Sequence, residues 1–489
     1  MLDDLVDRLG ALRLPSRRVF ALLVLAFFGF GLLLGNVARS RGDYTLAASA
    51  RPLKLVLPAA TTPAATTPGG DVGAGEVEAA SSEPPEAVAE PTPEASAPVE
   101  ATPASAPASK PGGSKQSETD ASSGAPGKSP SSKAGVPATK LPAIDHVFVI
   151  MLSDQPYAAV FGPESAAPYL AHTLEQRGEL LARLYGVAHQ QLANGIALLS
   201  GQGPTAATAA NCPIYEDLTP ATPGGEEQVL GDGCVYPATT PTLPGQLEVK
   251  HRSWRAYVQG IDEPGSVAGA CAHPAPGALD PSAAVPPPAA SYATFRNPFV
   301  YFHSLIDAPS CARDDVGLSA LSADLQSAKR TPSFSYIVPD RCHDASPGPC
   351  PGGGAGGPAA ADELLKQVVP KILASQAYKH GGLLVITVDQ APSSGEFADS
   401  SSCCSQPRFP NLPAPAGAAA ALGPEGGGQV GALLLSPFVK GGVITQAEYN
   451  QFSLLRTFED LFSLKHLGYA AGAKVKSLEP SLFRAKPAG

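Results

Sequence analysis

The second half of the chain alternates between short apolar runs and longer segments with helical spacing. Five runs rich in Val, Ile and Leu, bounded by turn-forming residues, predict buried strands at His146–Leu152, Trp254–Val258, Phe334–Val338, Leu383–Val388 and Val430–Leu435. Apolar residues at helical spacing predict helices at Tyr169–Leu184, His189–Ser200, Ala359–Ser375 and Gln451–Leu464. This alternation indicates an α/β domain with a mostly parallel central sheet and helices on both faces.

The N-terminal part has a different pattern. Residues 1–18 are charged, and residues 19–38 form an almost uncharged apolar segment of about the 20 residues that a helix needs to cross a bilayer. We expect a cytoplasmic segment followed by one transmembrane helix. A cleaved signal peptide is the alternative, but the apolar run is longer than usual for one and no A-x-A site closely follows it.

Residues 39–142 are dominated by Ala, Pro, Ser and Thr, with Glu in several stretches. Such a composition cannot bury enough apolar surface to offset the entropy of an ordered chain, so it predicts a disordered linker. The remaining residues, 143–489, are sufficient for one large domain. The predicted organisation is therefore an anchor, a spacer and one folded domain.

Charge and cysteine content bear on partners and compartment. The net charge of −10 and the lack of a basic stripe argue against a nucleic-acid partner. All eight cysteines lie in the C-terminal domain, and none forms a CxxC pair. Beside an export segment, an even number favours disulfides and a location outside the cytoplasm. Sequence neighbours are the preferred pairs, namely Cys212–Cys234, Cys271–Cys311, Cys342–Cys350 and Cys403–Cys404, although the adjacent last two could bond elsewhere. Basic residues flank the apolar segment on both sides and do not decide its orientation. The cysteines decide it better, and they predict a single-pass protein of the cell membrane with its C-terminal domain outside the cytoplasm.

Polar residues follow three of the predicted strands. Asp154 follows the first, Asp389 and Gln390 follow the fourth, and Asp344 comes shortly after the third. In a parallel sheet these strand ends can meet at one edge, where carboxylates gather around a cation. The three aspartates are therefore candidate ligands of a divalent metal, although each alone is more often a helix cap or a turn former.

A second candidate cluster opens the predicted helix after Tyr185. His189, Gln191 and Asn194 stand at its start, where free backbone N–H groups favour an anion. An ordinary capped helix would show the same pattern. Other motifs are absent or misplaced: there is no GxSxG or HExxH, and the GxGxxG at 426–431 precedes a strand instead of following one.

Several blocks in order resemble one known family. They are HVFVIMLSDQPYAAVFG, APYL, the HxxLxNxxALxSGQ pattern at 189–202, NPFVYFHSLID, SFSYIVPDRC, GGLLVITVD, GALLLSPFVKGG and YNQFSLLRTFEDLF. The stretch from 143 to 485 thereby resembles the phosphoesterase family of bacterial acid phosphatases, phosphatidylinositol-phosphate phosphatases and phospholipases C, within the alkaline phosphatase superfamily. The resemblance implies an alkaline phosphatase-like fold, a hydroxyl nucleophile and a metal held by acidic side chains.

The catalytic positions depart from that family's pattern. Where the family has Glu-Asn after the first strand, this chain has Ser153 and Asp154, and where it has a nucleophilic Ser, this chain has Gln191. Asp389 is followed by Gln390 instead of an acidic residue. Between Cys342 and Cys350, where the family often has an Asp and a following His-Asp, only Asp344 keeps its place, with Ser346 and Pro347 at the other two positions.

Three functions follow from these features. The preferred one is a membrane-anchored, extracytoplasmic phosphoesterase-like protein that is catalytically impaired and binds a phosphorylated small molecule, a lipid head group or an envelope partner. Gln191 would then occupy the nucleophile position without attacking, and His189, Asn194 and Gln390 would contact the ligand. The alternatives are an active metal-dependent phosphoesterase using Asp154, Asp344 and Asp389, and a structural scaffold of the envelope. A divalent metal of unspecified identity is one possible cofactor, and the alternative is that the chain binds none.

Overall fold

The computed structural model describes residues 140–262, 269–283, 292–348, 350, 353–414 and 424–487. The expected cytoplasmic segment, transmembrane helix and nearly all of the linker lie outside these residues and stay predictions. Among the residues that are described, none of the helices has both the length and the apolar character needed to cross a membrane.

An eight-stranded sheet forms the centre of the domain. Its strand order is β13-β2-β12-β11-β1-β10-β7-β9. The strands span β1 His146–Leu152, β2 Glu179–Leu181, β7 Trp254–Val258, β9 Asp315–Gly317, β10 Phe334–Val338, β11 Gly382–Val388, β12 Ala432–Leu435 and β13 Val443–Thr445. Only the two pairings of β12, with β11 and with β2, are antiparallel. The expectation of a mixed α/β domain around a large sheet is confirmed.

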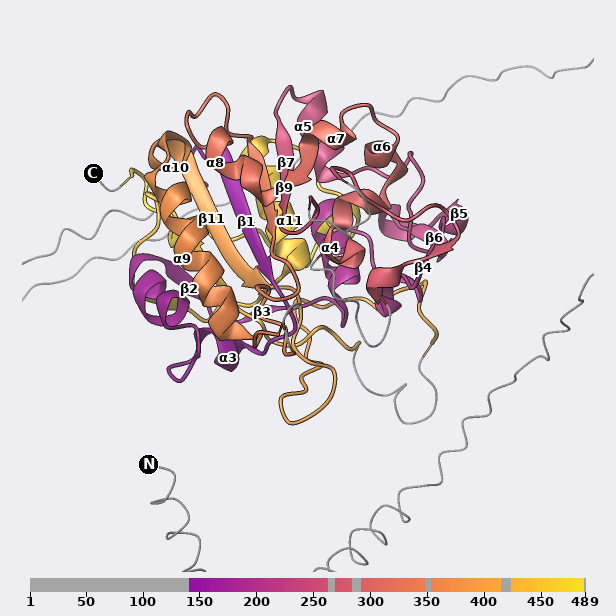
Figure 1. Ribbon diagram of the computed structural model, residues 1–489, viewed down its shortest axis with the longest axis horizontal. Helices are drawn as coiled ribbons and strands as arrows, with labels where there is room; N and C mark the ends of the chain where they lie inside the picture. The colour runs from indigo at the N-terminus through magenta and orange to yellow at the C-terminus, as the bar shows by residue number, and fades with distance from the viewer. Residues whose placement is uncertain are drawn as a thin grey trace, which may run out of the picture. The chain divides into compact units, whose positions relative to one another are not determined.

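The central strands are predominantly apolar because both faces of the sheet are covered. Every residue of β10 and β11 is buried, as are all but the first of β1. A strand with one solvent-facing side would alternate apolar and polar residues, which these strands do not. Figure 1 shows β11 and β1 side by side, and β1 pairs in parallel with β11 on one side and β10 on the other.

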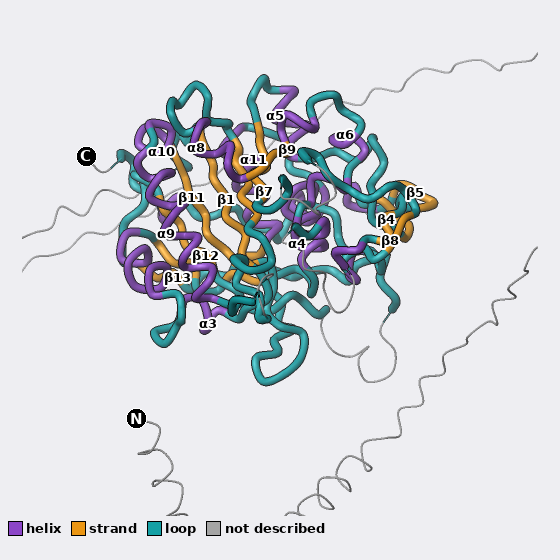
Figure 2. The backbone as a smooth tube through the Cα atoms, viewed as in Figure 1, coloured by secondary structure: helices purple, strands orange, loops and turns teal. Residues whose placement is uncertain are grey.

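Helices and three small sheets surround the central one. The helices are α3 Tyr157–Phe161, α4 Gln191–Ser200, α5 Leu243–Val249, α6 His303–Ile306, α7 Cys311–Asp314, α8 Leu321–Asp324, α9 Pro358–Ala374, α10 Gln376–Gly381 and α11 Gln451–Phe462. The small sheets pair β3 Leu184–Tyr185 with β14 Tyr449–Asn450, β4 Ile214–Tyr215 with β8 Ala278–Leu279, and β5 Thr219–Pro223 with β6 Val229–Asp232. Figure 2 shows β4, β5 and β8 gathered at one side, away from the central strands.

One predicted helix is wrong. The segment Tyr169–Leu184 is a single π-helical turn at Tyr169–Leu174, a 3₁₀ turn at Glu175–Arg177 and then strand β2. Gly178 ends the helical part with an extended backbone, and a side chain there would lie 2.5 Å from the carbonyl oxygen of Leu434. The close pairing of this segment with β12 therefore overrides the helical spacing of its leucines.

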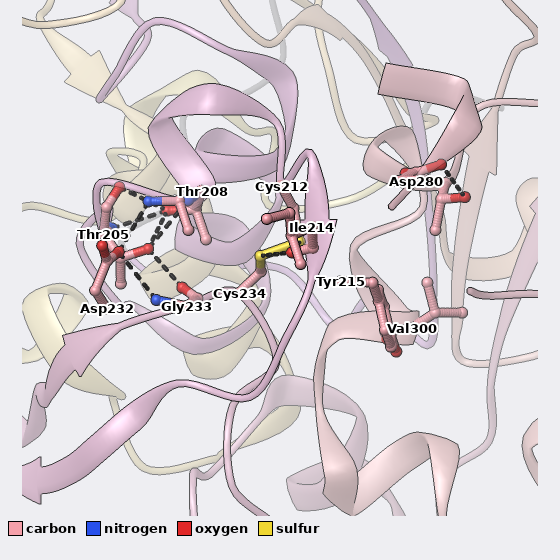
Figure 3. The surroundings of a disulfide bond; sticks show 12 residues. Thr205, Thr208, Cys212, Ile214, Tyr215, Asp232, Gly233, Cys234, Asp280 and Val300 are labelled. Atoms are coloured by element: carbon pink, nitrogen blue, oxygen red, sulfur yellow. Dashed lines mark hydrogen bonds between the residues drawn. A yellow bond between two sulfur atoms is a disulfide. The ribbon is translucent and has the colours of Figure 1, made fainter. Parts of the chain in front are cut away.

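Four disulfides join the described cysteines, in the pairs that the sequence analysis preferred: Cys212–Cys234, Cys271–Cys311, Cys342–Cys350 and Cys403–Cys404. The first lies beside a turn in which Thr205 Oγ1 accepts the backbone N–H of Thr208 at 3.0 Å and donates to the carbonyl oxygen of Gly233 at 2.7 Å (Figure 3). The disulfide and the hydrogen bond from Thr205 to Gly233 fasten the segment after α4 to the end of the β5–β6 hairpin.

Candidate functional site

The carboxyl ends of β1, β10 and β11 meet, as parallel neighbours must. The backbone N–H of Ser153, just after β1, donates to the carbonyl oxygen of Asp344 at 2.6 Å, and the N–H of Asp389, just after β11, donates to Leu152 at 2.9 Å. The N–H of Asp154 lies 3.4 Å from Oδ1 of Asp389. The three aspartates predicted from separate parts of the sequence therefore belong to one cluster.

The backbone around this cluster adopts conformations that side chains usually avoid. Asp154 has a φ of 52°, Ala345 a φ of 75° and Gln190 a φ of 85°. Asp accepts the left-handed region with little penalty, whereas Ala and Gln do so only where their surroundings hold them. Such residues concentrate at functional sites, where strain fixes the direction of neighbouring groups.

Arg296, which the sequence analysis did not single out, lies among the carboxylates. Its Nη1 is in ion-pair contact with Asp344, and its Nη2 donates to Ser346 Oγ at 3.1 Å. Ser346 also donates to Asp344, through its backbone N–H to Oδ1 and through its hydroxyl to Oδ2, both at 2.9 Å. The side chains of Arg296 and Asp344 are 9% and 2% exposed, so the pair is withdrawn from solvent.

The segment that carries Arg296 is fixed by close packing. Arg296 ends a 3₁₀ turn at Thr294–Arg296, and a second turn at Pro298–Tyr301 follows it. A side-chain carbon on Gly195 of α4 would lie 2.8 Å from the Pro298 ring, so glycine permits the contact. Between them, the Asn297 amide donates to the buried carboxylate of Asp315 at 2.8 Å. These contacts determine where the guanidinium of Arg296 lies.

Burial and mutual charge shift the pKa values of the cluster. Burial raises the pKa of Asp389 to about 7, an effect that Arg296 partly offsets, and burial also raises the pKa of Asp154 against the opposing influence of Arg296. Burial and the nearby Arg341 lower the pKa of Arg296 to about 9, while Asp389, Asp340 and Asp154 oppose that decrease. Arg296 therefore remains a cation at neutral pH, at the centre of the acidic groups.

Gln191 stands at the first position of α4, facing the same cluster. Its Oε1 accepts a hydrogen bond of 2.6 Å from Nδ2 of Asn211, which also donates to Oε1 of Gln190 at 2.9 Å. Oδ1 of Asn211 accepts the N–H of Leu192 at 3.2 Å. Asn211 thus forms hydrogen bonds with both glutamine side chains and with the first turn of α4.

The other predicted ligand-binding residues, Gln390, Asn194 and His189, have different roles in the structure. Gln390 accepts the backbone N–H of Gln190 and is 5% exposed. Asn194 is fully buried; its Oδ1 accepts the N–H of Val187 at 2.9 Å, and its Nδ2 donates to the carbonyl oxygen of Gln190 at 3.0 Å. Asn194 therefore shapes the turn before α4 from within. Nε2 of His189 lies 2.9 Å from the hydroxyl oxygen of the exposed Ser400.

Little space remains between these groups. The cavity at the strand ends has a volume of about 10 Å³, and Ser153, Gln191, Arg296, Asp344 and Asp389 are among the residues that line it. Such a volume holds about one water molecule at most. In this conformation a phosphoryl group has no room between Gln191 and the aspartates.

Comparison with known proteins identifies the family. The family model that matches residues 159–465, more than half of the chain, is that of the phosphoesterase family. The chain belongs to the phosphoesterase family. The family expected from the sequence blocks is thereby confirmed. No curated protein matches the chain.

Solved structures of distant similarity cover most of this phosphoesterase-family chain. One is a protein in the alkaline phosphatase superfamily from Vibrio parahaemolyticus, 14% identical, covering 73% of each chain with a TM-score of 0.40. Another is the sulfatase PsFucS1 from Pseudoalteromonas sp., 12% identical, with 71% of this chain and 73% of that chain covered and a TM-score of 0.37. A third is a lipoteichoic acid synthase from Listeria monocytogenes, 10% identical, with 72% and 80% covered and a TM-score of 0.37.

The predicted metal ligands do not fit a divalent cation as they stand. A metal of this kind needs oxygen ligands with free lone pairs around an open centre. Both carboxylate oxygens of Asp344 already accept hydrogen bonds from Ser346, and the guanidinium of Arg296 contacts Oδ2 as well. Oδ2 of Asp344 thus contacts both a hydroxyl donor and a cationic guanidinium, which leaves it no lone pair for a metal ion.

One other group of potential ligands is found among the described residues. Donor atoms of Asp340, Cys342 and His343 lie within 4.8 Å of one another. Cys342 is bonded to Cys350, so it offers no thiolate, and Oδ1 of Asp340 already accepts the backbone N–H groups of Cys342 and His343 at 3.0 and 2.9 Å. This group forms a turn stabilised by its own hydrogen bonds.

Two residues important to the site were missed in the sequence. Arg296 precedes the NPFVYFHSLID block that supported the family resemblance, but a single Arg in a short irregular segment carries no periodic signal. Asn211 lies in a loop next to Cys212, where Asn is expected as a turn former. Their contacts with Asp344 and Gln191 arise only from the tertiary fold.

Proposed function

We propose that this phosphoesterase-family chain no longer hydrolyses phosphate esters and acts by binding a partner in the cell envelope. The observation that carries the proposal is Gln191, an amide in the family's nucleophile position that is engaged by Asn211 at 2.6 Å. The amide N–H protons of glutamine are too weakly acidic to be removed at physiological pH, and the neutral amide is not a nucleophile toward phosphorus. Loss of a covalent nucleophile ordinarily costs several powers of ten in rate.

The geometry favours a macromolecular partner over a phosphorylated ligand at the strand ends. A cavity of about 10 Å³ does not admit a phosphoryl group. Arg296 is already paired with Asp344, and Asp389 and Asp154 also stabilise its charge, so its guanidinium is not free to bind a further anion. A partner would therefore contact the outer surface of the domain, and the former catalytic centre would serve as part of its core.

Placement in the envelope is the second part of the proposal. Residues 19–38 would anchor the chain in the membrane, and residues 39–142 would hold the domain away from it outside the cytoplasm. The four disulfides support this placement, because such bonds persist in oxidising compartments. A periplasmic or external protease that digests the domain on intact cells or spheroplasts would support it, and digestion only after lysis would contradict it.

The deciding experiment is a turnover assay of the purified full-length chain in detergent with its disulfides intact. Phosphomonoester and phosphodiester substrates are supplied with Mg²⁺, Mn²⁺, Zn²⁺ or Ca²⁺ in turn, and an Asp389→Asn variant is purified in parallel. We expect the native chain to show no turnover above that of the Asp389→Asn variant with any of the metals. Metal-dependent turnover by the native chain that the variant lacks would overturn the proposal.

One observation favours a hydrolase as the second candidate. Ser400 Oγ and Nε2 of His189 are 2.9 Å apart, the distance between a nucleophile and its base. Asp154 lies close enough to His189 for the two to interact electrostatically, because His189 acts to lower the pKa of Asp154. The same assay separates the candidates, because turnover that is lost in Ser400→Ala and kept in Ser401→Ala would establish Ser400 as the nucleophile.

A further inference from the structure

The strand-end carboxylates of Asp154, Asp344 and Asp389 need a nearby positive charge, and this need does not depend on what the surface of the domain binds. Asp344 and Asp389 are 1% and 4% exposed, and Asp154 is half-buried beside them. Several carboxylates brought together out of solvent repel one another unless they bind protons or a cation. The contacts of Arg296 indicate which group supplies that positive charge.

We propose that the guanidinium of Arg296 is the permanent cation of this cluster and takes the place of a divalent metal, so that the folded chain binds none there. The inference deepens the proposed function, because a centre closed by its own side chain has neither the metal nor the space that hydrolysis in this family would use. It concerns binding alone and is tested without any substrate.

The contacts of Arg296 are those of a built-in counter-ion. Nη1 pairs with Asp344, Nη2 donates to Ser346 at 3.1 Å, and Asp389, Asp340 and Asp154 all stabilise its charged form. A planar guanidinium can reach several carboxylates at once through its fork of donors. If it left the cluster, the carboxylate of Asp344 would stay buried without a counter-ion, which is strongly unfavourable.

The backbone holds Arg296 at this position independently of the carboxylates. The Pro298 ring packs on Gly195, and Asn297 donates to Asp315 at 2.8 Å. The guanidinium carbon of Arg296 also lies 5.6 Å from the centre of the Phe295 ring, on which Arg341 is placed at 5.7 Å. Because the backbone on the C-terminal side of Arg296 is fixed by these contacts and its guanidinium packs on Phe295, few rotamers of Arg296 would move the guanidinium out of the cluster and make room for an ion.

Manganese binding tests the proposal directly. The purified full-length chain, treated with chelator and dialysed, is titrated with Mn²⁺ and followed by electron paramagnetic resonance of the free ion and by the thermal unfolding midpoint. We expect no saturable site and no rise in the midpoint for the native protein. Arg296→Gln removes the cation and leaves the carboxylates, so it should gain a saturable Mn²⁺ site and be stabilised by the ion.

Arg341→Gln is the matched control, because Arg341 contacts the same Phe295 ring without an ion pair to Asp344. It should bind no more Mn²⁺ than the native chain. Asp344→Asn added to Arg296→Gln should abolish the gained site. If Arg296→Gln alone does not fold, Arg296→Gln combined with Asp154→Asn lowers the unpaired charge and keeps Asp344 and Asp389 as ligands, and it should show the same gain.

Two results would overturn the inference. One is a saturable Mn²⁺ site in the native chain that disappears in Asp344→Asn. The other is a folded Arg296→Gln or double variant that binds Mn²⁺ no better than native. Turnover by a native chain that binds no metal would overturn the proposed function and leave this inference standing, so the two failures are distinguishable.

Discussion

Nδ2 of Asn211 lies 2.6 Å from Oε1 of Gln191, and Oδ1 of the same asparagine accepts the N–H of the next residue, Leu192, at 3.2 Å. The side chain of Gln191, which the family resemblance suggests stands at the nucleophile position, is thus tied to the residue that stabilises the first turn of α4. Gln191 contributes to the local structure as a hydrogen-bond acceptor.

Replacing Gln191 by Ser should not give the chain phosphoesterase turnover. Gln191→Ser supplies a hydroxyl, but Arg296 still pairs with Asp344 and the cavity still lacks space for a phosphoryl group. We expect phosphomonoesterase and phosphodiesterase turnover to remain at the level of the native chain, with or without added divalent metals. Turnover gained by Gln191→Ser alone would show that the nucleophile was the main lesion and that Arg296 does not close the site.

Gly195 should be intolerant of even one methyl group. The carbon added by Gly195→Ala would lie 2.8 and 2.9 Å from two atoms of the Pro298 ring, so α4 and the Arg296 segment would have to separate. We expect a loss of roughly 1–3 kcal/mol in the free energy of unfolding, as for other overpacked cores. Denaturant unfolding monitored by circular dichroism measures the change.

Gly225→Ala is the control for Gly195→Ala, because a side-chain carbon at Gly225 would meet no atom within 4 Å. Its free energy of unfolding should stay within about 0.5 kcal/mol of the native value. Equal stabilities for the two variants would mean that the contact between Gly195 and Pro298 is loose, and the fixed position of Arg296 would need another explanation.

The sheet could be predicted from the sequence because its central strands are buried on both faces. The bounds of β1, β7 and β10 match the apolar runs, and α9 and α11 differ from their predictions by only one or two residues at an end. The segment after Tyr169 was misjudged because leucines spaced for a helix also suit a short buried strand. Gly178, which the pairing with β12 requires, was the available signal.

The part of the site that lies at the ends of neighbouring parallel strands could be predicted from the sequence. Asp154 and Asp389 follow neighbouring parallel strands, so their approach follows from the sheet. Arg296 reaches the cluster from a turn that is not part of the sheet, through a helix–turn contact between Gly195 and Pro298. Neither periodicity nor strand order specifies such a contact, and so the cation of the cluster could not be found before the fold was known.

The disulfides should differ in what they contribute to stability. Cys212–Cys234 spans 22 positions, whereas Cys403–Cys404 joins adjacent residues and closes essentially no loop. A disulfide stabilises mainly by restricting the unfolded chain, so removing the first as Cys212→Ala/Cys234→Ala should cost about 3 kcal/mol. Cys403→Ala/Cys404→Ala should cost distinctly less. Denaturant midpoints of the two double variants under non-reducing conditions make the comparison, and equal losses would contradict the loop argument.

Glu459 should make stability fall as the pH rises. It is fully buried in α11; its Oε1 accepts the N–H of Leu467 at 2.9 Å, and its Oε2 has no hydrogen-bond partner among the described residues. Burial raises the pKa of Glu459 to about 9. A carboxyl whose pKa is raised by folding contributes its full stability only below its unfolded pKa of 4.5, and that contribution is lost as the pH rises toward 9.

Glu459→Gln keeps the acceptor for Leu467 and removes the ionisation. Its advantage in the free energy of unfolding over the native chain should therefore be small near pH 5 and should grow toward pH 8, by at most about 1.4 kcal/mol per pH unit. Denaturant unfolding at a series of pH values measures this. The control, Glu363→Gln on the exposed face of α9, should change the free energy of unfolding by no more than about 0.5 kcal/mol. An advantage of Glu459→Gln that is constant between pH 5 and 8 would mean that the carboxyl is more solvated, or better paired, than its burial in α11 implies.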